Sequence, residues 1–213
     1  MTTPASRFSA AMQALPLVAI LRGLTPAEAP AVGDAIVEAG FRLLEVPLNS
    51  PSPLDSIALL RQRFPQALVG AGTVLQASQV AEVQAAGGEL IVSPNFDPVV
   101  VVEAVRLGLV CLPGVMTPTE AFGALAAGAS GLKLFPAELA SPAVLRAMLA
   151  VLPPGTPLLP VGGVTPDNMG AWRAAGAAGF GIGSALYKPG KSAAAVREDA
   201  LRFVAAFHAV LRA

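Results

Sequence analysis

Lys133 is the residue of this chain whose type fits its surroundings least. It lies in the segment Gly-Leu-Lys-Leu-Phe-Pro at 131–136, whose apolar side chains are typical of a buried strand. A charged ammonium group there is costly unless it is paired or gives up its proton. A neutral amine in an apolar pocket attacks carbonyl carbons, so this setting indicates Schiff-base chemistry. The other two lysines, Lys188 and Lys191, belong to a Tyr-Lys-Pro-Gly-Lys stretch that is typical of a surface loop.

Glu45 is the carboxylate best placed to act together with Lys133. It stands inside an apolar run, whereas Glu89 stands at the start of one. Strand side chains alternate between two faces, so both residues can face the same interior. The alternative is a buried ion pair that only satisfies both groups, but such pairs are seldom more favourable than apolar packing. Because perturbed titratable pairs mark functional sites, the pattern favours catalysis.

Short apolar runs alternate with longer amphipathic stretches along the whole chain. Eight runs are strand candidates, spaced by about 20–25 residues, which is the repeat of a strand–helix unit. Thr-Pro pairs that begin at positions 25, 117 and 165 predict helix starts, and Ala-Gly pairs predict helix ends. The eight candidate strands are 17–21, 43–46, 68–71, 90–92, 109–112, 131–134, 158–161 and 179–182.

The nearly continuous apolar character of these runs is typical of parallel strands covered by helices. Eight such units predict an α/β fold, a (β/α)8 TIM barrel, formed by residues 1–213 as a single domain. A doubly wound open sheet is the alternative, but no Gly-x-Gly-x-x-Gly pattern follows the first run. In a barrel, the groups that do chemistry lie at the C-terminal ends of the strands or just beyond them.

Several polar or bulky residues stand at these predicted strand ends. Arg22 can grip a carboxylate with its guanidinium group, although an ion pair at the rim is the alternative. Thr73 can donate a hydroxyl hydrogen bond to a substrate carboxylate, and its alternative role is a helix N-cap. Pro94 and Phe135 are expected to form walls of the pocket, and Phe135 can also be a core residue.

Small residues follow the last two predicted strands. They are Gly162, Gly163, Gly183 and Ser184. In barrels, the loops at this place often bind phosphate through backbone N–H groups, and glycine lets the backbone approach an anion closely. Each Gly-Gly or Gly-Ser pair could be an ordinary turn, but their joint position favours a phosphate site.

Composition excludes several other classes of protein. Of 213 residues, 54% are hydrophobic and 13% are charged, and the net charge is zero, which argues against a nucleic-acid partner. Glu103 and Arg106 interrupt the apolar stretch 99–116, and the N-terminal segment lacks the apolar core of a signal peptide. A lone Cys111 suits a reducing compartment such as the cytoplasm, and a single histidine, His208, argues against a zinc site.

Five stretches together give the chain a specific likeness. They are 44–51, 70–74, 91–95, 132–136 and 161–166, within a likeness that extends from 18 to 187. The chain resembles the 2-dehydro-3-deoxy-6-phosphogluconate and 6-phosphogalactonate aldolases, which are small class I aldolases. This resemblance implies a (β/α)8 barrel, a homotrimer, and activity without a metal or other cofactor. It implies as substrate a phosphorylated 2-keto-3-deoxy sugar acid, cleaved to pyruvate and glyceraldehyde 3-phosphate.

The resemblance also assigns roles to the residues identified above. It implies a Schiff base on Lys133, proton transfer by Glu45, and substrate binding by Arg22 and Thr73. The phosphate-binding backbone of the family falls on the four small residues at 162, 163, 183 and 184.

The loop after Glu45 departs from the phosphogluconate aldolases. Those usually carry an Arg-Thr pair here, whereas this chain has Asn49 and Ser50, like the phosphogalactonate branch. The two substrates differ in configuration at C4, so a loop that touches that hydroxyl is a plausible discriminator. The galactonate substrate is therefore expected, with the gluconate epimer, or both, as the alternative.

Two other functions would also be consistent with the predicted phosphate-binding loops. One is a barrel isomerase or epimerase that acts on a sugar phosphate, which would need no covalent lysine. The other is a non-catalytic sugar-phosphate-binding protein, which would have no reason to bury both Lys133 and Glu45.

Overall fold

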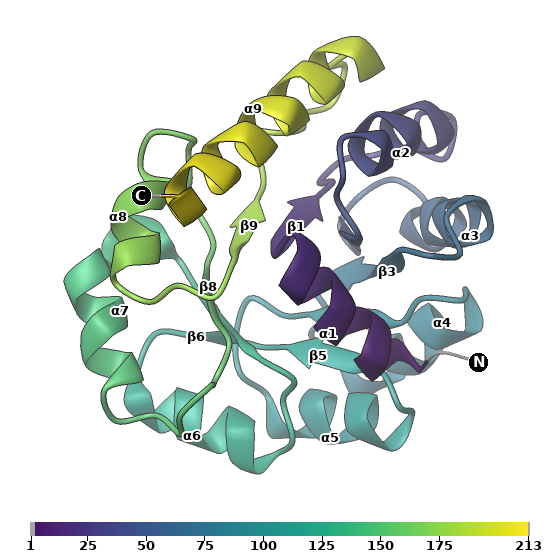
Figure 1. The fold of residues 1–213 in the computed structure, drawn as a ribbon. Helices are drawn as coiled ribbons and strands as arrows, with labels where there is room; N and C mark the ends of the chain where they lie inside the picture. Colours follow the sequence, from purple (N-terminus) through teal and green to yellow (C-terminus); the bar gives the residue numbers. More distant parts are fainter. Residues whose placement is uncertain (1–2, 213) are drawn as a thin grey trace.

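The computed structural model describes residues 3–212 and the side chains of residues 3–210, so the ends of the expected domain 1–213 lie outside it. Strands and helices alternate along the described chain, with the strands at the centre and the helices around them (Figure 1). The strands are β1 Leu17–Ile20, β2 Leu43–Pro47, β3 Leu68–Gly72, β4 Leu90–Val92, β5 Val110–Leu112, β6 Gly114–Val115, β7 Leu132–Leu134, β8 Leu158–Pro160 and β9 Phe180–Ile182. The helices are α1 Pro4–Ala14, α2 Ala29–Glu38, α3 Pro53–Arg63, α4 Ala77–Ala85, α5 Pro98–Arg106, α6 Pro118–Ala126, the 3-10 helix η1 Ala137–Leu139, α7 Pro142–Leu149, α8 Met169–Ala174 and α9 Ala193–Arg212.

All strand pairs are parallel, and they follow the order β5-β4-β3-β2-β1-β9 and β6-β7-β8. A bridge between Val161 and Gly181 joins the second group to β9. At the other junction, Pro113 separates β5 from β6, because proline has no N–H group to donate to a ladder. The sheet thus curls into the predicted (β/α)8 barrel. The fifth predicted strand, 109–112, corresponds to β5, and β6 follows it beyond the proline.

The expected helix starts are partly correct. Thr117 caps α6, with its side chain accepting from Glu120 N while the Glu120 carboxylate accepts from the Thr117 backbone. The prediction was wrong for Thr25 and Thr165, which open hydrogen-bonded turns that lead into α2 and α8. In both turns a side chain three residues on accepts from the threonine N–H, so the regular helix begins only after it.

The core has two parts that follow from the alternation of strand side chains. Leu44 and Val46 of β2 pack outward among the helices, while Leu43 packs inside the barrel. The inner layer also contains Phe8 and Ala11 of α1. Helix α1 therefore closes the N-terminal end of the barrel, and a filled apolar layer supports the groups above it.

The same alternation turns Glu45 and Lys133 inward. Leu132 and Leu134 pack among the helices, so the residue between them faces the barrel interior. Within 3–212, no helix combines the length and apolar character needed to cross a bilayer.

Candidate active site

Lys133 and Glu45 share a small cavity inside the barrel, above its apolar layer. Its other walls come from apolar residues of several strands, among them Val18, Val92 and Leu159. The two side chains are nearly inaccessible, with exposed fractions of 7% for Lys133 and 1% for Glu45. Two titratable groups thus stand together where the surrounding protein offers little solvation.

The two groups do not form an ion pair. Among the described side chains, no nitrogen–oxygen distance between them falls within 4.0 Å. Glu45 Oε2 is buried and has no hydrogen-bond partner in the described chain. A buried carboxyl oxygen without a partner costs free energy, so the pair does not serve as a mutually satisfied structural element.

Burial changes the protonation of both groups. It raises the pKa of Glu45 to about 7, although the positive charges of Lys133 and Arg22 act in the opposite direction. Burial also lowers the pKa of Lys133, and the charge of Arg22 lowers it further, while Glu45 opposes both effects. The pKa of each group is thereby brought closer to neutral pH. Near that pH the carboxyl group can exchange a proton and the neutral amine can attack a carbonyl.

The Phe135 ring forms one wall beside the amine. Lys133 Nζ lies 4.5 Å from the ring centroid, within the range of a cation–π contact. Phe135 also lines a larger cavity that opens above Lys133 and that we call the outer cavity, so it is a wall residue as the sequence predicts.

Gly72 at the end of β3 makes room for Glu45. A Cβ atom on Gly72 would lie 1.8 Å from Glu45 Oε2, so no larger residue fits beside the carboxyl in this position. This glycine was missed from the sequence, where it directly follows the predicted strand 68–71. The available signal was that place, since glycine at a strand often marks a close approach of another group.

The outer cavity above Lys133 has a volume of about 680 Å³. Its size is in the range of small-molecule sites, and it lies at the C-terminal ends of the strands. Of the residues expected from the sequence, it is lined by Arg22, Asn49, Lys133, Phe135, Gly162, Gly163, Gly183 and Ser184. We call its part lined by the last four residues the glycine end.

Two hydrogen bonds join the loop after β1 to the loop after β2. Arg22 Nη1 donates to Asn49 Oδ1 at 2.6 Å, and Gly23 N donates to Ser50 Oγ at 2.9 Å. Asn49 lines the cavity, whereas Ser50 is buried behind it. Arg22 pairs with no carboxylate of the described chain, so the rim ion pair considered from the sequence is not present.

Thr73 and Pro94 lie at the ends of β3 and β4, partly buried but outside the cavity lining. Thr73 does not cap a helix, because α4 begins later with Gln76 as its N-cap. Its backbone is left-handed, with φ of 57°, which is rare and strained for a β-branched residue. Strain of this kind tends to persist at functional positions.

At the glycine end, Gly162 and Gly163 both have positive φ, at 106° and 63°. Glycine adopts these angles easily, so the conformation fits either a tight turn or a loop that receives an anion. The N–H groups of Gly163 and Ser184 donate to no other group in the described part of the chain. These donors are therefore available to a ligand.

Several cavity residues were missed by the sequence reasoning. Ile20, Val161 and Tyr187 are apolar or aromatic residues of ordinary strand and loop segments, and nothing in their types marked them. Glu138 and Lys188 also line the cavity, and their only signal was their position shortly after β7 and β9.

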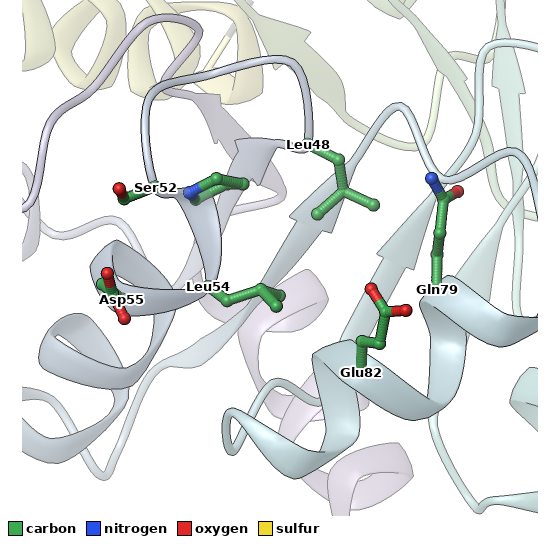
Figure 2. A pocket seen from close by; sticks show the side chains of 7 residues that line it. Leu48, Ser52, Leu54, Asp55, Gln79 and Glu82 are labelled. Atoms are coloured by element: carbon green, nitrogen blue, oxygen red, sulfur yellow. The ribbon is translucent and has the colours of Figure 1, made fainter.

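A third cavity, of about 360 Å³, lies between α3 and α4, on the other side of the loop after β2 (Figure 2). Leu48 and Leu54 face Gln79 and Glu82 across it. The consecutive residues Leu48 and Asn49 thus line different cavities. Within residues 3–212 no cluster of three His, Cys, Asp or Glu residues suits a metal, here or elsewhere.

A barrel whose interior holds an amine with a lowered pKa and a carboxyl group beside it is the framework of aldolases that work through a Schiff base. The chain belongs to the KDPG and KHG aldolase family, whose model matches residues 8–200.

Individual relatives resemble nearly the whole chain. A probable 2-dehydro-3-deoxy-6-phosphogalactonate aldolase of Rhizobium meliloti is 50% identical over 196 residues, which cover 92% of each protein. The 2-dehydro-3-deoxy-6-phosphogalactonate aldolase of Escherichia coli is 46% identical over 91% of this chain and 95% of its own length. The native KDPGal structure superimposes with a TM-score of 0.92 at 45% identity and covers 93% of this chain and 97% of its own. The 2-dehydro-3-deoxy-phosphogluconate aldolase of Treponema pallidum is more distant, at 35% identity over 69% of this chain and 70% of its own.

Proposed function

We propose that this chain cleaves 2-dehydro-3-deoxy-6-phosphogalactonate to pyruvate and glyceraldehyde 3-phosphate through a Schiff base on Lys133. The observation that carries the proposal is the unpaired Lys133–Glu45 couple inside the barrel, with the pKa of the amine lowered and that of the carboxyl at about 7. The relatives of 46% and 50% identity support the choice of reaction.

Covalent bond formation begins at the C2 ketone of the substrate. The neutral Lys133 amine adds to C2. The carbinolamine hydroxyl then takes a proton from the Glu45 carboxyl and leaves as water, which gives a protonated imine and a Glu45 carboxylate. Glu45 then takes the proton of the C4 hydroxyl. The C3–C4 bond breaks, its electrons enter the imine to form an enamine, and the aldehyde carbon becomes C1 of glyceraldehyde 3-phosphate.

Glu45 serves again in the second half of the reaction. It now carries the proton from the C4 hydroxyl and donates it to C3 of the enamine, which restores the imine. Water hydrolyses that protonated imine and releases pyruvate and the neutral Lys133 amine, while the proton set free returns to the Glu45 carboxylate. A carboxyl group whose pKa lies near neutrality can act as both base and acid in one turnover.

The other predicted residues bind the substrate in this proposal. Arg22 and Thr73 orient the pyruvate half, Pro94 and Phe135 bound it, and the glycine end holds the phosphate. Support comes from the free N–H groups at that end and from the strained backbone of Thr73. Binding the distant phosphate fixes the reacting carbons above Lys133.

We assign to this enzyme a preference for the substrate with the galactonate configuration at C4. Asn49 lines the cavity and Ser50 supports the same loop, which is where the phosphogluconate aldolases differ. A cleavage assay with the two C4 epimers tests this assignment. We expect a higher kcat/KM for the galactonate substrate; an equal or higher value for the gluconate substrate would contradict it.

We further infer that residues 1–213 form one domain, that the protein is cytoplasmic, and that it assembles as a homotrimer. The lone buried Cys111 suits a reducing compartment. An apolar surface on α5 supports assembly, since Val99, Val102 and Val105 are exposed at helical spacing. Light scattering tests the assembly: the protein should have three times the mass of the chain, and Val102→Glu should lower that mass.

Borohydride reduction in the presence of pyruvate tests the covalent step. We expect mass mapping to find the pyruvate adduct on the peptide of Lys133 and on neither Lys188 nor Lys191. Lys133→Met should lose both the adduct and the turnover. Cleavage that survives this substitution would exclude the mechanism.

A further inference from the structure

Two charged side chains of the outer cavity take no part in the steps above. Glu138 lies in η1 after β7, Lys188 lies in the loop between β9 and α9, and both line the cavity together with the glycine end. Both residues are exposed, and within the described chain neither forms an ion pair. A substrate phosphate bound at the glycine end would meet both charges.

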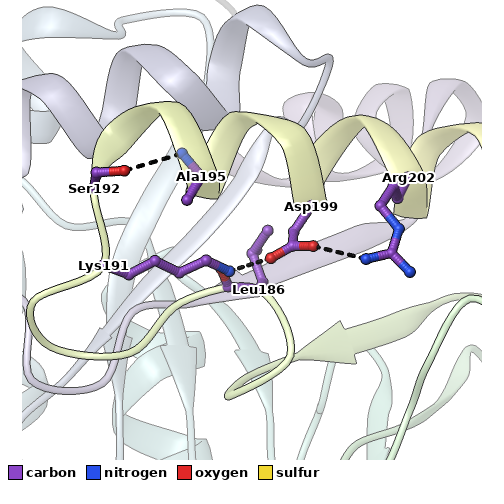
Figure 3. Close-up of polar contacts among 6 residues, drawn as sticks. All are labelled: Leu186, Lys191, Ser192, Ala195, Asp199 and Arg202. Carbon is purple, nitrogen blue, oxygen red and sulfur yellow. Dashed lines mark hydrogen bonds and ion pairs between the residues drawn. The ribbon is translucent and has the colours of Figure 1, made fainter.

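Lys191 shows how this chain uses a lysine that stabilises the fold. Its Nζ donates to Leu186 O at 2.7 Å and forms an ion pair with Asp199, whose other oxygen accepts from Arg202 (Figure 3). The charge of Lys191 is therefore used within the protein. Lys188 has no such partner among the described residues, so its charge is available to a ligand.

The backbone that carries Lys188 is held on both sides. Tyr187 is buried, and its hydroxyl lies 3.5 Å from Glu28 Oε2. Pro189 packs against Gly23, where an added Cβ would lie 2.5 Å from Pro189 Cγ. Lys188 O accepts from Lys191 N at 3.1 Å. A free ammonium group on a fixed backbone loses little backbone entropy when it contacts a ligand.

Glu138 lies against the glycine end itself. A Cβ on Gly162 would be 2.0 Å from Glu138 Oε2, and a Cβ on Gly163 would be 2.9 Å from Glu138 Cγ. The carboxyl group thus covers the loop whose N–H groups would receive a phosphate. Two anions at one place repel each other, so a bound phosphate must move this carboxylate aside.

We propose that Lys188 and Glu138 together set the affinity of the glycine end for a phosphate dianion. The Lys188 ammonium contacts the phosphate, and the Glu138 carboxylate is the group that the phosphate displaces. This inference rests on the aldolase function proposed above and adds two residues to its phosphate site.

Substrates with and without the phosphate separate this role from a structural one. Lys188→Met should lower kcat/KM for the phosphorylated substrate about fivefold, as loss of one partly screened charge contact predicts, while Lys188→Arg should retain most of it. Glu138→Gln should raise the same quantity about two- to fivefold. Neither Lys188→Met nor Glu138→Gln should change kcat/KM for the unphosphorylated 2-dehydro-3-deoxygalactonate.

Matched controls account for the change in net charge. Arg202→Met removes a cation and Glu198→Gln an anion from exposed positions of α9 outside this cavity, and neither should change the preference for phosphate. Equal effects of Lys188→Met on both substrates would overturn the assignment of Lys188. An unchanged or lowered preference in Glu138→Gln would overturn that of Glu138.

The same measurements keep the two proposals apart. If the wild-type protein gives no pyruvate adduct on Lys133 or no cleavage, the aldolase function fails. If the wild type cleaves the phosphorylated substrate preferentially and both Lys188→Met and Glu138→Gln leave that preference unchanged, only the inference about Lys188 and Glu138 fails.

Discussion

The carboxyl group of Glu45 lies directly against the backbone of Gly72, so that a Cβ atom on Gly72 would be 1.8 Å from Glu45 Oε2. The pairing of β2 with β3 brings the two together, because Glu45 of β2 lies opposite the β3 residue two positions before Gly72. Glu45, the acid and base of the proposed mechanism, can therefore occupy its position only because Gly72 on the neighbouring strand has no side chain.

Gly72→Ala should abolish most of the activity and leave the fold intact. The added methyl group takes the place of the carboxyl oxygens, so Glu45 must turn away from the bond it acts on. A displacement of about 1 Å can lower kcat about 100-fold. Steady-state kinetics and circular dichroism measure the two effects.

Gly170→Ala in α8 is the matched control, because its Cβ would meet only Val210 Cγ2 at 3.8 Å. Its activity should equal that of the wild type. Gly72→Ala with wild-type kcat would show that the position of Glu45 is unimportant for turnover.

The stability of the protein should depend on pH through Glu45. Burial raises its pKa from 4.5 to about 7 in the folded chain. Between these values the folded state retains a proton that the unfolded state has released, so the free energy of unfolding falls as pH rises from about 4.5 to about 7. Glu45→Gln cannot titrate, so the stability of the wild type relative to this variant should fall by on the order of 3 kcal/mol over this range.

Denaturant unfolding of both proteins at pH values from about 4 to about 8 measures this difference. It should become constant above pH of about 7. Glu198→Gln, at an exposed position on α9, should show no such trend relative to the wild type. A difference that stays constant for Glu45→Gln as well would mean that the carboxyl titrates at its ordinary pKa.

Asn49 should act on the reaction through the charge of Arg22. Asn49→Asp places a carboxylate where a neutral oxygen now accepts from Arg22 Nη1 at 2.6 Å. The resulting ion pair would compete with the substrate carboxylate for the guanidinium group, so KM should rise about tenfold while kcat changes little. Asn49→Ala should have a smaller effect because the charge of Arg22 stays free.

The exposed ion pair of Arg63 and Asp34 supplies a control for that experiment, since Asp34→Asn alters an arginine partner outside the outer cavity and should leave KM unchanged. A KM for Asn49→Asp equal to that of the wild type would show that Arg22 does not bind the substrate.

The barrel and the inward direction of Glu45 and Lys133 could be predicted from the sequence because both depend on local periodicity. Apolar runs at the repeat of a strand–helix unit specify the fold, and a charged residue between two leucines that pack on helices must face the interior. Lys133, flanked by Leu132 and Leu134, shows this directly.

Contacts between distant loops could not be predicted in the same way. Glu138 reaches Gly162, and Pro189 reaches Gly23, only because the barrel brings those loops together. The left-handed backbone of Thr73 could not be predicted either, since threonine rarely adopts it and the sequence indicated a substrate contact or, alternatively, a helix cap. The residues missed are thus those whose positions depend on tertiary contacts.

Thr73 offers a test in which stability and activity should change in opposite directions. Its φ of 57° strains a β-branched residue by about 1–3 kcal/mol, a strain that glycine would not feel. Glycine also gains freedom in the unfolded chain, which offsets about 0.5–1 kcal/mol of this benefit. Thr73→Gly should therefore be at least as stable as the wild type in denaturant unfolding, and its kcat/KM should fall about tenfold because the hydroxyl that binds the substrate carboxylate is lost.

Thr73→Ser keeps the hydroxyl group, so it should retain most of the activity. If Thr73→Gly and Thr73→Ser lose activity equally, the hydroxyl is not the group that matters; if Thr73→Gly is clearly less stable than the wild type, the left-handed backbone is not a source of strain.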